Sequence, residues 1–178
     1  MVRMESLDIL VRQVLPQVLP CPRGMVLDAL QAVAKHFCEQ TAVWRERLEE
    51  TGLQGEADIP LSLPTGSRLV MILGVWLDGN RLLPDDYRAE GNSLCLRTVL
   101  PRECSVVVDA ALCPSRLSER MPEQLIEAWG DVLAYGALAR LKAMSGQHVT
   151  WTDAAGAQMA LEQYNEGVAR ARIRAMSR

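Results

Sequence analysis

Apolar residues recur every three or four positions towards both ends of the chain, whereas its middle consists of short apolar runs separated by Gly, Pro and Asn. The first spacing is typical of amphipathic helices and the second of β-strands. The strands do not alternate with helices, so a parallel sheet is not expected. The pattern predicts an α+β fold with N-terminal helices over about 5–40, a small antiparallel β-sheet over about 42–113 and two long C-terminal helices over about 121–178.

Two helices are predicted in the first third of the chain. The first covers about 5–18, with Ser6 as a candidate N-cap. The second covers about 25–40, and Pro22 suits its first turn. The segment at 42–50 fits either a strand or a continuation of this helix, and its alternation favours the strand.

The middle third is expected to form four or five antiparallel strands. Its runs rich in β-branched and apolar residues are IPLSLP, RLVMILGVWLDG, NSLCLRTVLP and CSVVVDAAL. Runs of this kind, bounded by Gly, Pro and Asn, are typical of strands joined by tight turns.

Four acidic residues lie close together between these strands. They are Asp78, Asp85, Asp86 and Glu90. Asp-Gly-Asn at 78–80 and Glu-Gly-Asn at 90–92 favour hairpin turns, because Gly and Asn accept a positive φ. The Asp pair follows Pro84, where Asp can bond its own backbone. A calcium loop needs ligands at alternating positions closed by a Glu, and this spacing does not supply them. We therefore interpret these acids as turn residues rather than as a metal or catalytic site.

The last third predicts two long helices. The first, over about 121–145, has Gly146 just past its end and combines a broad apolar face with many Ala and Gly residues. Thr152 is the candidate N-cap of the second helix, which continues to the end of the sequence. The residues that we expect in a core or a subunit interface are Trp129, Leu133, Gly136 and Tyr164.

The closing helix carries a group of arginines after a narrow apolar stripe, which consists of Ala157, Leu161, Tyr164, Val168 and Ala171. The arginines are Arg170, Arg172, Arg174 and Arg178, and Ile173 and Met176 lie among them. Basic residues near a helix C-terminus offset the helix dipole, but four of them exceed that role. Because Arg pairs bidentately with carboxylates, the helix is suited to dock on an acidic, grooved partner. An ordinary solvated terminus is the alternative.

Composition narrows the class of protein. The chain has 178 residues, 49% apolar and 23% charged, which is sufficient for the core of one domain spanning 1–178. Its net charge of −3 gives no reason to expect tight binding to nucleic acid. No apolar run reaches the roughly 18 residues of a membrane span, and acids come too early for a signal peptide.

Few residues are suited to catalysis or metal binding. The five cysteines include no CxxC pair, which fits reduced thiols better than a disulfide framework. His36 and His148 have no partners at the spacing that zinc requires. The glycine-rich phosphate-binding motifs are missing as well. We therefore expect no enzyme activity, no metal and no cofactor.

Four segments, in their order along the chain, carry a resemblance to a known family. They are DALQAVAKHFCEQTAVWRERL, RLVMILGVWLDGNRL, LIEAWGDVLAYGALARLKAMSG and YNEGVARARIRAM. This order, which covers most of the chain, resembles the head-to-tail adaptor (connector, or head-completion) proteins of tailed bacteriophages. Such adaptors consist of α-helices packed with a small β-sheet.

The resemblance implies a structural protein of the virion neck, made in the host cytoplasm. It implies a homo-oligomeric ring, commonly of twelve copies, that sits under the portal protein and extends the DNA ejection channel. DNA would pass without specific binding, and the turns of the sheet would face the next tail or nozzle protein. The portal-docking candidates are then Arg170, Arg172, Ile173, Arg174 and Met176, and the tail-facing candidates are Asp78, Gly79, Asn80, Asp85 and Asp86.

Three alternatives remain open at this point. The first is another phage tail structural protein, a tail terminator or tube component, which would not bind the portal. The second is a small α+β enzyme that uses Asp or Cys chemistry, which would need such groups to converge in a pocket. The third is a soluble regulatory binding module, which would stay monomeric on its own.

Overall fold

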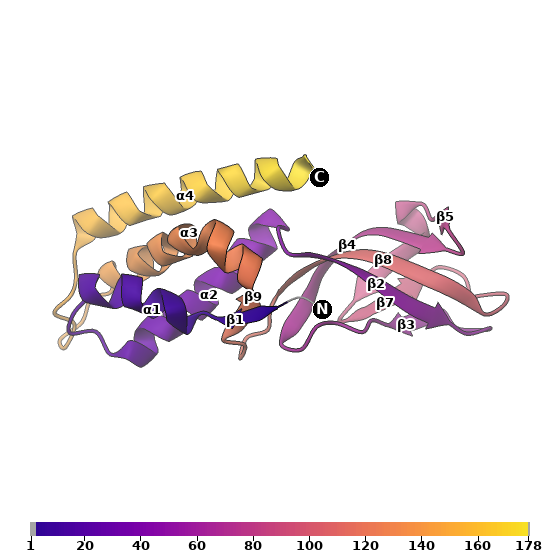
Figure 1. The fold of residues 1–178 in the computed structure, drawn as a ribbon, viewed down its shortest axis with the longest axis horizontal. Helices are drawn as coiled ribbons and strands as arrows, with labels where there is room; N and C mark the ends of the chain where they lie inside the picture. The colour runs from indigo at the N-terminus through magenta and orange to yellow at the C-terminus, as the bar shows by residue number, and fades with distance from the viewer. Residues whose placement is uncertain (1–2, 178) are drawn as a thin grey trace. The chain divides into compact units, whose positions relative to one another are not determined.

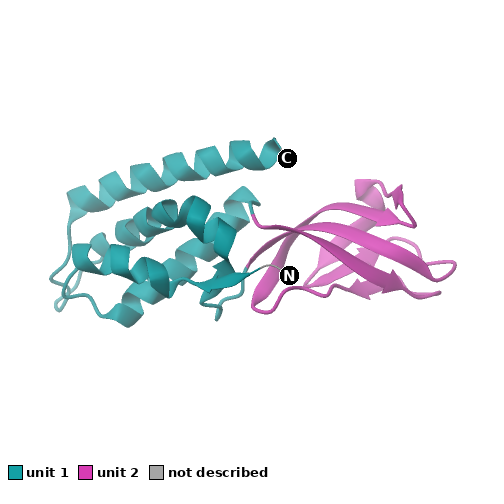
Figure 2. Cartoon of the chain, in the orientation of Figure 1, with its two compact units in different colours: residues 1–43, 114–178 teal, residues 44–113 magenta. Residues whose placement is uncertain are grey.

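A computed structural model describes residues 3–177 and confirms the α+β class, with N-terminal helices, antiparallel sheets in the middle and two long C-terminal helices (Figure 1). The chain forms two compact units, coloured separately in Figure 2. The helical unit combines Met1–Val43 with Pro114–Arg178, and the β unit is Trp44–Cys113. That the chain acts as one domain over 1–178 stays a prediction.

The helical unit contains four α-helices and a two-stranded sheet among its described residues. The helices are α1 (Asp8–Val14), α2 (Arg23–Thr41), α3 (Glu123–Lys142) and α4 (Ala154–Met176), with a 3-10 turn, η1, at Leu15–Gln17. Strand β1 (Met4–Ser6) pairs antiparallel with β9 (Arg120–Pro122). Helix α3 packs against each of the other three helices, so it is the centre of this unit.

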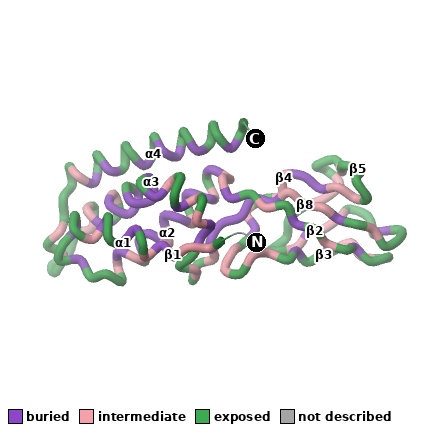
Figure 3. Tube along the Cα trace, in the orientation of Figure 1, coloured by how far each residue is buried: buried purple, intermediate pink, exposed green. Residues whose placement is uncertain are grey.

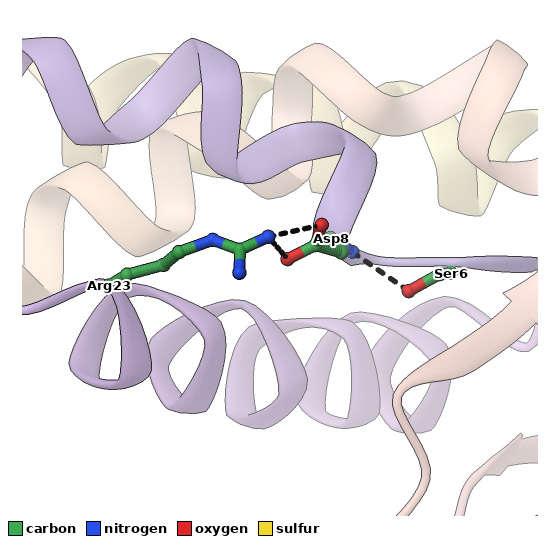
Figure 4. A network of polar contacts seen from close by, with 3 residues as sticks. All are labelled: Ser6, Asp8 and Arg23. Carbon is green, nitrogen blue, oxygen red and sulfur yellow. Dashed lines mark hydrogen bonds and ion pairs between the residues drawn. The ribbon is translucent and has the colours of Figure 1, made fainter.

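The start of the first helix differs from the prediction. Residues Met4–Ser6 form β1 rather than a helical turn, because they pair with β9 and the Leu7 amide donates to the Glu119 carbonyl (2.8 Å). The Asp8 amide then donates to the Ser6 Oγ (3.2 Å), and the Asp8 carboxylate binds the Arg23 guanidinium at the start of α2 (Figure 4). The predicted boundary at residue 5 is therefore wrong, although Ser6 does bond the first turn.

Small residues bring α4 close to α3. A side chain added at Gly167 would lie 2.5 Å from the Val132 methyl groups, and one at Gly136 would meet Val33 and Tyr164 within 3 Å. The face of α4 that is buried consists of Ala157, Ala160, Tyr164, Gly167, Val168, Ala171 and Ala175. Leu161, which the predicted stripe included, is 42% exposed, because Ala160 takes the inward position.

The four core or interface candidates all lie in the helical unit. Leu133 is fully buried, and Gly136 and Tyr164 are buried beside it in the contact between α3 and α4. Trp129 is half-buried, and its ring centroid lies 5.7 Å from that of Phe37 on α2. These positions therefore contribute to the packing of one subunit.

The β unit contains two antiparallel sheets, ordered β2-β8-β4-β5 and β3-β7-β6. Their strands are β2 (Arg45–Gly52), β3 (Asp58–Pro60), β4 (Ser67–Leu77), β5 (Asn80–Arg81), β6 (Tyr87–Glu90), β7 (Ser93–Leu96) and β8 (Cys104–Pro114). The segment after α2 is thus a strand, as its alternation favoured. Leu48 of β2 is opposite Val108 of β8, and both are buried in the core of this unit.

Both predicted hairpin turns are present. Leu77 pairs with Asn80, and the two residues between them, Asp78 (φ 46°) and Gly79 (φ 82°), adopt the left-handed conformation that a type I′ turn requires. Gly91 (φ 60°) begins the two-residue turn between β6 and β7. A 3-10 turn, η2 (Pro84–Asp86), holds the Asp pair. The acids at 78, 85 and 86 are therefore turn residues.

The link between α3 and α4 corrects two predicted boundaries. Helix α3 ends at Lys142, four residues before Gly146. The N-cap of α4 is Asp153, whose carboxylate accepts from the Gly156 amide (2.9 Å) and from Lys142 (3.0 Å). Thr152 is the residue before this N-cap, and its hydroxyl donates to the Met144 carbonyl (2.6 Å).

We expect Gly167→Ala to destabilise the protein. The new methyl group would enter the volume of the β-branched Val132 side chain, and overpacking of this kind costs about 1–3 kcal/mol. This loss outweighs the gain in helix propensity of about 1 kcal/mol. Gly24→Ala on the exposed start of α2, where nothing lies within 4 Å, is the matched control and should keep or raise stability. Urea unfolding of both variants measures the difference, and equal stabilities would contradict the close approach.

Candidate functional site

The C-terminal end of α4 has a buried face and an exposed face. Ala171 and Ala175 are buried, whereas Ile173 is 67% and Met176 84% exposed, and Arg170 is exposed on the same helix. Buried and exposed positions follow one another along the whole helix (Figure 3). Arg178 lies outside the described residues.

Arg172 is engaged within the subunit. Its Nε donates to the Gln40 carbonyl (3.0 Å) in the last turn of α2. The last carbonyls of a helix have no partner within the helix, and they form the negative end of its dipole. Arg172 therefore stabilises the end of α2, which is a different role from the predicted docking contact.

Arg174 is also engaged within the subunit. Its guanidinium lies 6.0 Å from the centroid of the Trp129 ring, in the range of a cation–π contact. The same ring contacts Phe37, so the indole links α2, α3 and α4. No local pattern indicates this contact, because Trp129 and Arg174 are 45 positions apart.

Three of the docking candidates remain available to a partner. Arg170, Ile173 and Met176 follow one another at intervals of three residues, so their side chains lie along one side of α4. They make no hydrogen bond or ion pair within the part of the chain that the structure describes. We call these three residues the outer row. One cation beside two large apolar side chains suits a partner groove that is apolar and edged with carboxylates.

The tail-facing turn candidates also divide into residues that bond within the chain and residues that form no ion pair. The Asp78 carboxylate accepts from the Ser105 amide (3.0 Å) and pairs with Arg102 (2.8 Å), so it serves the hairpin itself. Asp85 and Asp86 form no ion pair among the described residues, and Leu83 before them is 69% exposed. This turn therefore presents an apolar side chain next to two carboxylates.

Cys95 comes nearest to a catalytic arrangement among the described residues, because its Sγ contacts the Asp58 and Glu90 carboxylates (3.5 and 3.7 Å). His36 and His148 are exposed, and residues 3–177 contain no group of three His, Cys, Asp or Glu side chains that could hold a metal ion. Burial raises the pKa of the Cys95 thiol, and its hydrogen bond to Asp58 raises it further. Burial also raises the pKa of Cys104. These two thiols are therefore protonated at neutral pH and poorly suited to nucleophilic chemistry.

No protein-family model matches the chain, and no curated protein sequence matches it either. Among the helices that the structure describes, none is both long and apolar enough to cross a membrane. The functional proposal therefore rests on the residues and their arrangement.

We expect Arg172→Ala to lower the free energy of unfolding by roughly 1 kcal/mol, because a carbonyl at the end of α2 loses its donor. Arg170→Ala removes the same side chain two positions earlier, where it forms no hydrogen bond or ion pair with residues 3–177, and should leave stability unchanged. Thermal unfolding of the two variants in parallel gives the comparison. If Arg170→Ala proved the more destabilising, the assignment of inner and outer arginines would be wrong.

Proposed function

We propose that this chain is a structural virion protein that forms a ring between the portal and the tail of a tailed bacteriophage. In this role it extends the channel through which DNA leaves the head, and it performs no catalysis. Such a protein is a head-to-tail adaptor, located in the neck of the virion. The order of helices, sheet and closing basic helix, which resembles that family, supports it.

The outer row is the observation that carries the proposal. A large apolar residue that is 84% exposed, with another at 67% beside it, is unfavourable on a helix that has already buried its other face. A docking partner would cover Ile173 and Met176 and would pair with Arg170. The portal protein, with clefts between its subunits, is the partner that the adaptor role assigns to this end of α4.

The charge of the β unit is compatible with a DNA channel. It contains eleven Asp and Glu residues and seven Arg, with no Lys or His, which gives a formal charge of −4. Affinity for DNA comes chiefly from Lys and Arg contacts to phosphates. A unit with this charge would let DNA pass without holding it.

Point substitutions test the docking role better than a truncation. Removing α4 from Val168 onward would also remove the buried Ala171 and the Arg172 bond to α2. The triple variant Arg170→Glu, Ile173→Asp and Met176→Asp changes the outer row alone. Met159→Asp alters an exposed apolar residue (68%) of the same helix and is the control.

We expect the triple variant to fold and to lose attachment to portal-bearing heads that lack this protein. Electron microscopy of heads mixed with purified protein would count those that gain a ring below the portal. The wild type and Met159→Asp should both attach. Normal attachment by the triple variant would remove the docking role from α4, and failure of the wild type to attach to any heads would contradict the adaptor function itself.

A further inference from the structure

The helical unit contains an open cleft of about 610 Å³ between α2, α3 and α4. Its apolar floor is made of small residues, including Gly136, Ala139 and Ala157. No Asp or Glu lines it, although acidic residues outnumber basic ones in the chain as a whole. The polar lining consists of side chains that can donate hydrogen bonds: His36, Gln40, Arg140, Gln158, Tyr164 and Asn165.

One of these donors is buried and has no partner. Tyr164 is only 6% exposed, its ring lies against Gly136 and Val33, and its hydroxyl has no hydrogen-bond partner among the described residues. Burial raises the pKa of Tyr164 to about 12, so the hydroxyl keeps its proton. Nearly all buried polar groups in folded proteins are satisfied. A buried donor without an acceptor at the edge of a cleft is open to an acceptor that comes from outside the chain.

The charge beside this hydroxyl specifies the acceptor. Arg140 lines the same cleft, is exposed and forms no ion pair within residues 3–177. Both Arg140 and Arg172 lie close enough to lower the pKa of Tyr164, in opposition to the larger effect of burial. A carboxylate would accept from the Tyr164 hydroxyl and pair with Arg140, while the floor would take an apolar side chain. The cleft therefore fits a segment in which an apolar residue precedes an acid.

The chain itself contains such a segment in its other unit. Leu83 is 69% exposed, and the η2 turn that follows presents Asp85 and Asp86 without ion pairs in the part of the chain described. Pro84 lies between Leu83 and Asp85 and makes the turn rigid. Binding would therefore cost little conformational entropy. The β unit that carries this turn has a net charge of −4, which complements the basic edge of the cleft.

We propose that the Leu83–Asp86 turn of a second copy of this chain occupies the cleft. Leu83 lies on the small-residue floor of the cleft. Asp85 pairs with Arg140 and accepts a hydrogen bond from the Tyr164 hydroxyl. The turn and the cleft are different surfaces, so the contact is head-to-tail, and repetition of it can close a ring. The inference rests on the proposed function in that it names the contact between neighbours in the ring.

Charge exchange tests the contact. Arg140→Glu alone, and Asp85→Arg with Asp86→Arg, should each lower the mass of the assembly in sedimentation velocity, because like charges then face each other. Joining the three substitutions in one chain should restore assembly. Two exposed controls should assemble normally: Arg12→Glu on α1, which has the same charge change as Arg140→Glu, and Glu103→Arg, which reverses one acid of the β unit. Assembly unaffected by either exchange, no recovery in the combined variant, or a wild type that is monomeric at every concentration would each overturn the proposal.

Tyr164→Phe separates a role in the interface from a role in the fold. Removing an unpartnered hydroxyl should leave the unfolding free energy of the chain equal or higher, as urea unfolding in the dissociated Asp85→Arg, Asp86→Arg background would measure. The same change should weaken assembly of the wild-type background about 10-fold, since one acceptor loses its donor. Unchanged assembly, or a loss of subunit stability, would contradict the proposed contact.

These results are distinguishable from those that test the adaptor function. If rings attach to portal-bearing heads and form with every charge exchange, the adaptor function is supported and this contact is contradicted. If assembly is lost and restored by the charge exchanges but no assembly attaches to heads, the contact is supported and the adaptor function is contradicted.

Discussion

The close approach of α3 and α4 is the constraint on which the rest of the helical unit depends. Gly167 has no side chain to separate α4 from Val132, and Gly136 gives the ring of Tyr164 its place against α3. A helix held so near buries mostly small residues, which is why Ala is the commonest residue on its inner face, and the larger Tyr164 fits there because it lies against Gly136. The same constraint places the Tyr164 hydroxyl beside the cleft and brings the end of α4 over Trp129.

This geometry divides the arginines of α4 into two kinds. A side chain at 172 reaches the last turn of α2, and one at 174 reaches an indole that Phe37 already holds. Residue 170 precedes these two arginines and residue 173 lies between them. Both point away from these contacts, because each residue of a helix is rotated by about 100° from the one before it. The sequence alone therefore overstates the number of arginines available to a partner, since two of the three described ones, Arg172 and Arg174, make contacts within the chain.

Local patterns predicted most of the elements, and the elements and contacts that they did not predict share a cause. The period of the apolar positions and the residue types of a turn are local properties, so α2, β2, β8 and both Gly-containing hairpins followed from the sequence. Strand β1 is three residues long and exists only through its pairing with 120–122, more than a hundred positions away. The choice of Ala160 over Leu161 as the inward residue depends on how closely α4 packs, and the partners of Arg172 and Arg174 depend on the tertiary fold. The cleft was missed for the same reason, although an Ala- and Gly-rich helix facing a Tyr was its available signal.

The buried hydroxyl of Tyr164 is difficult to explain within one subunit. A Phe at this position would occupy the same space against Gly136, and it would avoid the penalty of about 1–3 kcal/mol that an unsatisfied buried group carries. The Asp pair of the η2 turn poses the matching question, because a turn needs only one Asp to bond its backbone and these carboxylates form no ion pair in the described chain. Each feature is unfavourable or superfluous alone, and each supplies what the other lacks. The proposed contact between two copies would remove both difficulties at once, and it would leave the outer row of α4 unused.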